Sequence, residues 1–156
     1  MDVTTDFPIA SIQKRLTAFV IDDIVVVGLI LAIFYTQLME IASHLPETFT
    51  AESIALFKNE MNQFSVNNLL GIVALKIVYH TFFIWQNGMT LGKYFVKIKV
   101  IDIGSKETPT LPKAFLRASI RIVSEAFFYL GFIFAFFSPL KQTLHDKISR
   151  CVVVDV

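Results

Sequence analysis

Three long apolar runs, separated by polar segments, set the pattern of this chain. The first covers residues 16–39, where the ionisable side chains are Asp22, Asp23 and Tyr35. At ~1.5 Å per residue, a helix of this length crosses a bilayer core of ~30 Å with some tilt. The second run, 69–86, is near the short end of the range for a spanning helix. Both runs are therefore predicted to be transmembrane helices.

The third apolar run, 118–140, follows a helix predicted to start near Pro112. Charged residues recur in that helix at four-residue steps: Lys113, Arg117, Arg121 and Glu125. Such a stripe predicts a helix at the membrane interface. The apolar residues behind it contain Gly131 and end at Pro139, which leaves a marginal length for a span. We expect a re-entrant or short hairpin element here, with a third full span as the alternative.

The polar segments indicate which side of the membrane each one occupies. Residues 40–68 are acidic and are predicted to be external, with an amphipathic helix indicated by apolar residues at helical spacing: Ile54, Phe57, Met61 and Phe64. Residues 87–117 are basic, and together with the tail 141–156 they are predicted to be cytoplasmic. Ser11 is a predicted helix cap just before the first span, and Lys14 and Arg15 place that end in the cytoplasm.

Two short segments have strand character. Residues 95–101 alternate apolar with basic side chains, and the valine-rich end 151–156 is the other β-rich run. Pairing them would build a small cytoplasmic sheet. The predicted fold class is therefore a mainly α membrane protein: a single domain, 1–156, with two clear transmembrane helices, a third apolar segment and a small β pairing.

Composition supports this class. The chain has 156 residues, of which 54% are hydrophobic and 17% charged, which is too apolar for an ordinary soluble domain. The formal net charge of +1 gives no reason to expect nucleic acid as a partner. Cys151 is the sole cysteine, so no intrachain disulfide can form.

The familiar catalytic and ligand-binding motifs are absent from the sequence. The segment from Gly88 to Lys93 has one residue too few between its glycines for a P-loop, and Tyr94 stands where a P-loop needs Ser or Thr. The three histidines and Cys151 are too scattered for a zinc site, and no nucleophile motif is present. We expect no enzymatic activity, no metal and no cofactor.

The candidate chemistry lies inside the membrane. Two adjacent carboxylates in a spanning helix, Asp22 and Asp23, each cost about 2.5 to 3.5 kcal/mol and are normally turned toward a partner or water. Lys76 and His80 share one face of the second span at a matching depth. We expect these four residues to form an ion- or proton-binding cluster, with Lys76 neutralising an aspartate. The alternative is that the same groups only hold the helices together.

Further charged residues flank this cluster. Arg15 either anchors the topology or pairs with Asp22, seven residues along the same helix. Glu125 is expected to pair with Arg121 one turn away. His145 and Asp146 are expected to clamp the cytoplasmic ends of the helices, where they could meet Arg15.

Three pieces of sequence in this order resemble the RDD family of bacterial membrane proteins, named for an arginine and two aspartates. They are Arg15-x6-Asp22, Gly88-Met-Thr-Leu-Gly92-Lys93, and Leu144-His145-Asp146 before the valine-rich end. The resemblance covers the chain from about residue 11 to its end. It implies that Arg15 and Asp22 are the first two signature residues and that Asp146 is the third, with Asp23 open as an alternative. It also implies a role in transport.

Two classes of function follow. In the first, the protein is a transporter or cation/proton exchanger of the bacterial inner membrane, acting as a homo-oligomer or with a partner chain because three apolar segments cannot enclose a pathway. In the second, it is a non-transporting accessory, assembly or regulatory subunit whose basic cytoplasmic face contacts a partner or anionic lipid.

Overall fold

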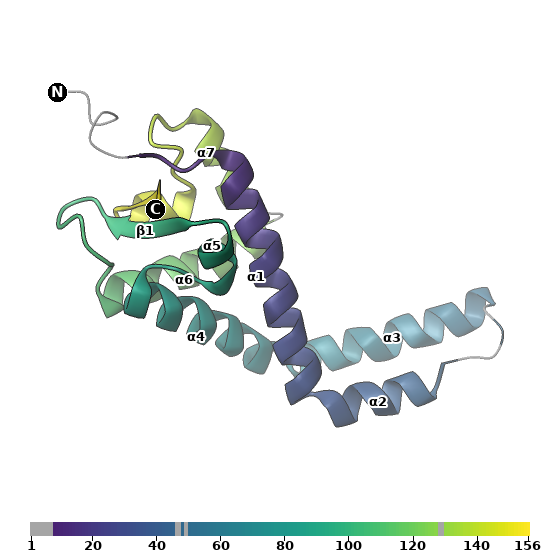
Figure 1. Ribbon diagram of the computed structural model, residues 1–156. Helices are drawn as coiled ribbons and strands as arrows, with labels where there is room; N and C mark the ends of the chain where they lie inside the picture. The colour runs from purple at the N-terminus through teal and green to yellow at the C-terminus, as the bar shows by residue number, and fades with distance from the viewer. Residues whose placement is uncertain (1–7, 46–47, 49, 128–129) are drawn as a thin grey trace.

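The structure, a computed structural model, describes residues 8–45, 48, 50–127 and 130–156. A helical body carries a small sheet on one side, and two helices project from the other side as an arm (Figure 1). In chain order the elements are α1 (Ile12–Ile33), α2 (Tyr35–Ser43), α3 (Ala51–Asn67), α4 (Leu69–Asn87), α5 (Leu91–Phe95), β1 (Ile98–Asp102), α6 (Leu111–Ala126), α7 (Leu130–Phe137), α8 (Leu144–Ile148) and β2 (Cys151–Asp155).

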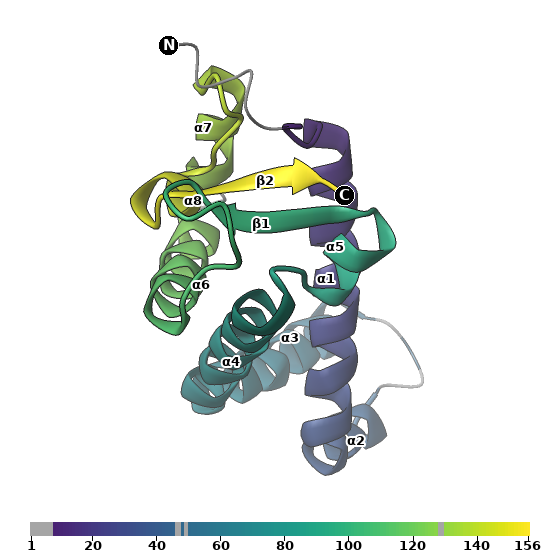
Figure 2. The ribbon, with the colours of Figure 1, turned by 60° about the vertical axis from the view of Figure 1, so that its left-hand side comes forward.

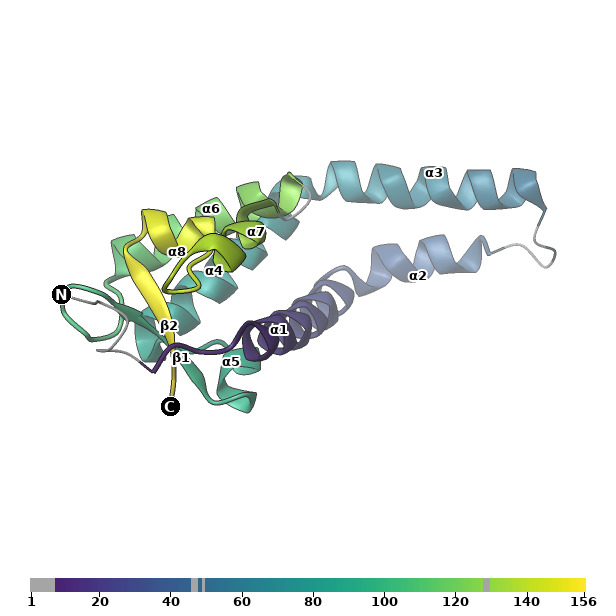
Figure 3. The same cartoon turned by 90° about the horizontal axis from the view of Figure 1, so that it is seen from above.

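The first apolar run forms two helices where one was expected. Helix α1 begins after Ser11, whose hydroxyl accepts a hydrogen bond from the Lys14 backbone N–H at 3.2 Å, so the predicted cap is confirmed. It ends at Ile33, and α2 follows after Phe34. The Phe34 ring meets Phe64 of α3 edge-on, with ring centroids 5.6 Å apart. The chain bends at Phe34, and α2 therefore runs beside α3 in the projecting arm (Figure 3). The bend results from packing between helices, so the apolar periodicity of the run does not predict it.

The second apolar run forms α4, with bounds close to those predicted. Helices α1 and α4 are the two described helices that are long and apolar enough to cross a membrane. In the most apolar 18-residue stretch of each helix, only 17% of the residues of α1 and 22% of those of α4 are buried inside the protein. The core helix of a soluble protein would be mostly buried, so these exposures favour helices that face an apolar solvent.

The predicted β pairing is confirmed. Strand β1 runs antiparallel to β2, with Ile98 opposite Asp155 and Asp102 opposite Cys151. Ile9, just before α1, forms a further bridge to Val154. A core of small and β-branched residues from these strands, α1, α4 and α6 lies beneath the sheet. The start of the described chain therefore lies beside β2, so that both ends of the described chain meet at the sheet (Figure 2).

The third apolar segment is divided between α6 and α7, two helices shorter than the first two candidate spans. Helix α6 starts at the predicted place, with Pro112 in its first turn. Its charged stripe does not lie at an interface as expected, because Arg117 and Arg121 are buried. The opposite face of α6 exposes apolar side chains, among them Phe115 and Val123. The helix is thus polar toward the protein and apolar toward its surroundings.

Candidate functional site

Asp22, in the middle of α1, is fully buried and held by side chains and backbone from α4 and α5. The Tyr79 hydroxyl donates to Oδ1 at 2.9 Å, and the Thr90 hydroxyl donates to Oδ2 at 2.6 Å. The Gly92 backbone N–H donates to Oδ1 at 2.8 Å, and the Lys93 ammonium lies 3.7 Å from Oδ2. A buried carboxylate is costly unless it is hydrogen-bonded and paired. Asp22 satisfies both conditions.

The glycines before Lys93 explain how α5 reaches Asp22. Gly88 ends α4 in the left-handed conformation, with φ +71°, and turns the chain back toward α1. Gly92 then lies so close to α1 that a Cβ atom there would fall 2.2 Å from the Ala18 carbonyl oxygen. No other residue allows this approach, which brings the Gly92 N–H within hydrogen-bond distance of Asp22.

Lys93 has an unusual environment for a lysine. Its side chain is buried, and its ammonium donates to Thr90 at 3.4 Å in addition to pairing with Asp22. Burial lowers the pKa of Lys93 to about 7, against the opposing attraction of Asp22. The ammonium can therefore release its proton near neutral pH, beside a carboxylate that carries a charge of opposite sign.

A second buried carboxylate, Asp146 of α8, joins α1 to α6. Arg117 donates to its Oδ1 through Nε at 2.9 Å and Nη2 at 2.6 Å, and Arg15 donates to Oδ2 at 3.2 Å. Arg15 also donates to the carbonyl oxygens of Lys141 at 2.6 Å and Val153 at 3.0 Å. The expected clamp between Arg15 and Asp146 is confirmed, and Arg15 reaches Asp146 where the alternative had it pair with Asp22.

The protonation states of this clamp follow from its surroundings. Burial raises the pKa of Asp146, but the charges around it, chiefly Arg117, outweigh burial and hold the value well below that of an ordinary aspartate. Burial lowers the pKa of the neighbouring His145 well below its ordinary value. At neutral pH Asp146 is therefore ionised and His145 is neutral.

A third group of charges is centred on Arg121 of α6. Its Nε donates to Glu125 at 2.9 Å, its Nη1 lies 3.3 Å from His80 Nδ1, and its Nη2 lies 3.8 Å from Asp23. Its guanidinium also stacks over the Phe19 ring at 5.1 Å. Glu125 accepts a further hydrogen bond from Lys76 at 2.8 Å. The expected pair between Arg121 and Glu125 is confirmed.

The cluster expected from the sequence is thus regrouped. Asp22 meets Tyr79, Thr90, Gly92 and Lys93, whereas His80 and Lys76 belong to the group around Arg121. The expectation that Lys76 neutralises an aspartate is wrong, because its partner is Glu125. Asp23 keeps 35% of its side chain exposed and has one long ion pair, whereas Asp146 is buried among several donors. This contrast favours Asp146 as the second aspartate of the signature.

Sequence reasoning missed four side chains of the site: Tyr79, Thr90, Lys93 and Arg117. Lys93 and Arg117 were assigned to the basic cytoplasmic segment. This segment contains six lysines and arginines, and the sequence does not distinguish the two that are buried from the others. The signal that could have found Lys93 is its place directly after the glycine pair, because a glycine-directed approach of two backbones brings the next side chain into contact as well. Among the described residues, no group of three or more His, Cys, Asp or Glu side chains is arranged to hold a metal ion.

Comparisons with known proteins support this interpretation of the motifs. A family model described as "RDD family" matches residues 9–150. An uncharacterized protein of Rickettsia prowazekii (strain Madrid E) is 32% identical over 96 residues, which is 60% of this chain. The match spans about half of that relative, 53% of its length. No solved structure matches the chain.

Proposed function

The chain belongs to the RDD family, whose members are generally membrane proteins, and on this premise we propose that it is an oligomeric membrane transporter that exchanges a monovalent cation for a proton. The observation that carries the proposal is the contact between Asp22 and Lys93, two buried charges of opposite sign joined across α1 and α5. An ionisable residue inside a membrane is by default a candidate for an ion or proton pathway.

The exchange itself needs only these two side chains. With Lys93 protonated, its ammonium balances the Asp22 carboxylate. A monovalent cation that binds to Asp22 provides the same balance, so the Lys93 proton is repelled and leaves. Because the pKa of Lys93 is about 7, this release costs little at neutral pH. One proton leaves for each cation that binds, and the buried net charge stays constant.

The surface of the helices supports a location in lipid. Helix α6 presents apolar side chains outward and its charges inward, the reverse of a helix at the surface of a soluble protein. Helices α1 and α4 expose apolar residues along most of their length. The two candidate spans are too few to enclose a pathway, so the proposal includes a homo-oligomer in which α1 and α4 of several copies pack together.

The distribution of charge supports the orientation. Basic residues gather in the segment 87–117, which includes β1 of the sheet, while the arm of α2 and α3 is acidic. We propose that the sheet side is cytoplasmic in a bacterial inner membrane and that the arm lies on the opposite side.

One observation favours a second function, that of a non-transporting accessory or assembly subunit. Asp22 accepts three hydrogen bonds, and Asp146 is held by two arginines. Buried carboxylates whose hydrogen bonds are made within the protein are expected where side chains hold helices together. In that case the buried charges fix the packing of α1, α4, α6 and α8, and the exposed arm contacts a partner.

The experiment that separates the two functions is ion flux in proteoliposomes. Purified protein is reconstituted with an internal pH dye, and proton movement is followed after addition of Na⁺ or K⁺. We expect cation-driven proton flux for the natural protein and its loss in Asp22→Asn. The control is Asp155→Asn, which removes an exposed carboxylate paired with Lys14. Absence of flux in the natural protein, or unchanged flux in Asp22→Asn, overturns the exchanger and leaves the accessory role.

A further inference from the structure

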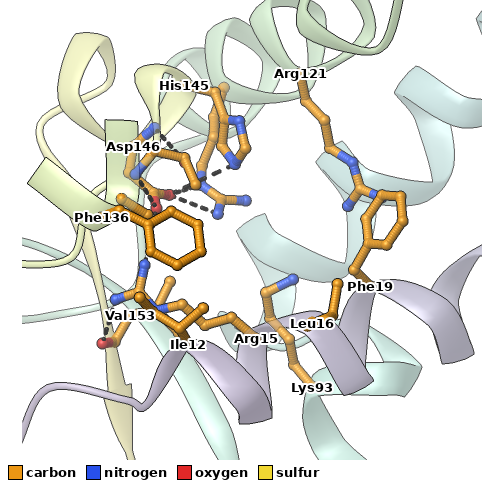
Figure 4. Close-up of a pocket in the computed structure, with 13 residues that line it drawn as sticks. Ile12, Arg15, Leu16, Phe19, Lys93, Arg121, Phe136, His145, Asp146 and Val153 are labelled. Carbon is orange, nitrogen blue, oxygen red and sulfur yellow. Dashed lines mark hydrogen bonds and ion pairs between the residues drawn. The ribbon is translucent and has the colours of Figure 1, made fainter. Parts of the chain in front are cut away.

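A cavity of about 130 Å³ lies between α1, α5, α6, α7 and α8. Basic side chains line it from three sides: Arg15 from α1, Lys93 from α5, and Arg117 and Arg121 from α6. Figure 4 shows Lys93, Arg121 and His145 pointing toward the same space from different elements. Asp146 is the acidic residue among those that line it. The cavity is therefore strongly electropositive.

The charges around the cavity do not balance. Among the described residues, Arg15 and Arg117 share Asp146, Lys93 pairs with Asp22, and Arg121 and Lys76 share Glu125 and Asp23. Five basic side chains thus share four carboxylates. A buried positive charge without a counter-charge is costly, and one anion bound in the cavity would supply the missing counter-charge when Lys93 is protonated.

Several side chains that line the cavity can donate further hydrogen bonds. Arg15 Nε is buried and has no hydrogen-bond partner in the described part of the chain, and Arg121 Nη2 has the long 3.8 Å ion pair but no hydrogen bond. The two contacts of the Lys93 ammonium, at 3.4 Å and 3.7 Å, are longer than an ordinary charged hydrogen bond. Donors of this kind are suited to the oxygens of a phosphate or carboxylate.

The rest of the cavity wall is apolar. Leu16 and Phe19 come from α1, and Ala135 and Phe136 from α7. Leu16 is 61% exposed and Phe136 is 69% exposed, although both line the cavity, so they stand at its mouth. Neighbouring residues of α7, Phe134 and Phe137, are exposed as well. A hydrocarbon chain that leaves the cavity would continue over this apolar surface.

We propose that this cavity binds the anionic head group of an amphiphile, a phosphate or carboxylate attached to a hydrocarbon chain, as in an anionic phospholipid. Lys93, Arg121 and Arg15 Nε contact the head-group oxygens, and the chain lies along Leu16 and Phe136. This site differs from the cation position beside Asp22, and its occupancy is measured by binding and not by flux. Failure of either proposal therefore leaves the other standing.

The titration of Lys93 links binding to pH. It faces Asp22 from α1, Arg117 and Arg121 from α6, and Asp146 from α8. Without an anion, burial and the two arginines favour its neutral form, and the pKa is about 7. A bound anion favours the ammonium and raises this pKa. Binding is therefore accompanied by proton uptake above pH 7 and weakens as the pH rises.

The test uses the full chain purified in an uncharged detergent, with binding followed by native mass spectrometry and by the melting temperature. Dioleoylphosphatidylglycerol is expected to bind and to raise the melting temperature, whereas dioleoylphosphatidylcholine and inorganic phosphate are expected to bind at least about tenfold more weakly, a difference of about 1.4 kcal/mol. Equal effects of the two lipids would overturn the anionic site. Inorganic phosphate binding as tightly as phosphatidylglycerol would overturn the role of the hydrocarbon chain.

Two variants of the cavity act by different means. Lys93→Gln removes a charge, and Ala135→Leu fills the cavity without changing any charge, since Ala135 is a buried part of its wall. Both are expected to weaken phosphatidylglycerol binding at least about tenfold. Lys147→Gln removes an exposed lysine of α8 outside the cavity and is expected to bind normally. Helical content and elution volume report on folding, and normal binding by both folded cavity variants would overturn the proposal.

Discussion

Arg15 and Asp146 are 131 residues apart in the sequence and are joined by a hydrogen bond of 3.2 Å. The same Arg15 guanidinium holds the carbonyl of Val153 in β2, and the same carboxylate holds Arg117 of α6. One ion pair thus fixes the first helix to the last helix and the last strand. Arg15 and Asp146 therefore act together on the architecture, while Asp22 contacts a separate set of partners.

Asp146→Asn is expected to destabilise the protein by about 3 to 5 kcal/mol, because it leaves Arg15 and Arg117 buried without their shared counter-charge. Asparagine retains an oxygen that can accept from the Thr143 backbone N–H, so the cap of α8 is preserved. Thermal or denaturant unfolding in detergent measures the loss. A variant as stable as the natural protein would show that the clamp contributes nothing.

The same carboxylate gives a pH dependence with a definite sign. The pKa of Asp146 is lowered in the folded protein relative to about 3.9 in the unfolded chain. Its contribution to stability is therefore complete above about pH 4 and is lost as the pH falls toward the folded value. The stability difference between the natural protein and Asp146→Asn should shrink below pH 4. A difference that stays constant down to pH 2.5 would contradict the assignment.

Gly92→Ala is expected to destabilise the protein by about 1 to 3 kcal/mol or more, because the new Cβ would lie 2.2 Å from the Ala18 carbonyl oxygen and 3.0 Å from Asp22 Cγ. The matched control is Gly28→Ala on the same helix as Asp22, where a Cβ atom meets nothing within 4 Å. That change should leave stability equal or raise it slightly, since alanine favours a helix. Similar losses in both variants would mean that the close approach of α5 to α1 is unimportant.

Local pattern predicted the elements better than their partners. Helices α1 and α4, the Ser11 cap and the pairing of β1 with β2 follow from hydrophobicity, capping and periodicity, which act within a few residues, although α1 ends at Ile33 and not at residue 39 as expected. The bend at Phe34 depends on Phe64 in another helix, and a sequence pattern carries no information about that contact. The contact between Arg15 and Asp146 was expected because both residues were placed at the cytoplasmic ends of the helices.

The candidate site was half predicted for a related reason. Asp22 stood out because a carboxylate in an apolar run is costly wherever it points. Its partners were sought on α4 at a matching depth, but they come mainly from Thr90, Gly92 and Lys93, after that helix has ended. The turn at Gly88 folds this segment back onto α1, and one glycine in a sequence does not specify where the chain returns. Arg117 and Arg121 were placed at an interface because they belong to a charged stripe at four-residue steps. Their burial depends on acceptors from other elements, which this spacing does not reveal.

Lys93 gives a second pH dependence of stability, in which burial disfavours the charged form of the side chain. The pKa of Lys93 is about 7 in the folded protein and about 10.4 in an unfolded chain, so the unfolded state binds more protons between these values. Stability should therefore rise with pH from about 7 to 10, with each unit of pKa difference worth about 1.4 kcal/mol. Lys93→Met should lack this rise, and Lys147→Met should keep it. Identical pH profiles for the natural protein and Lys93→Met would refute an environment that lowers this pKa.

The fold also predicts which segments share a side of the membrane, and labelling of single cysteines measures this. Cys151 is buried, and burial raises the pKa of its thiol, so the natural protein should react slowly with a membrane-impermeant maleimide.

Ser105→Cys, in the exposed turn after β1, and Val156→Cys, just after β2, should react from the same side because the two strands are paired. Asn62→Cys, at an exposed position of the projecting helix α3, should react from the opposite side, because α1 and α4 separate the arm from the sheet. Labelling of intact cells and of inverted vesicles distinguishes the sides. If all three positions react from one side, α1 and α4 do not cross the membrane, and the cation exchange proposed for Asp22 has no second compartment to serve.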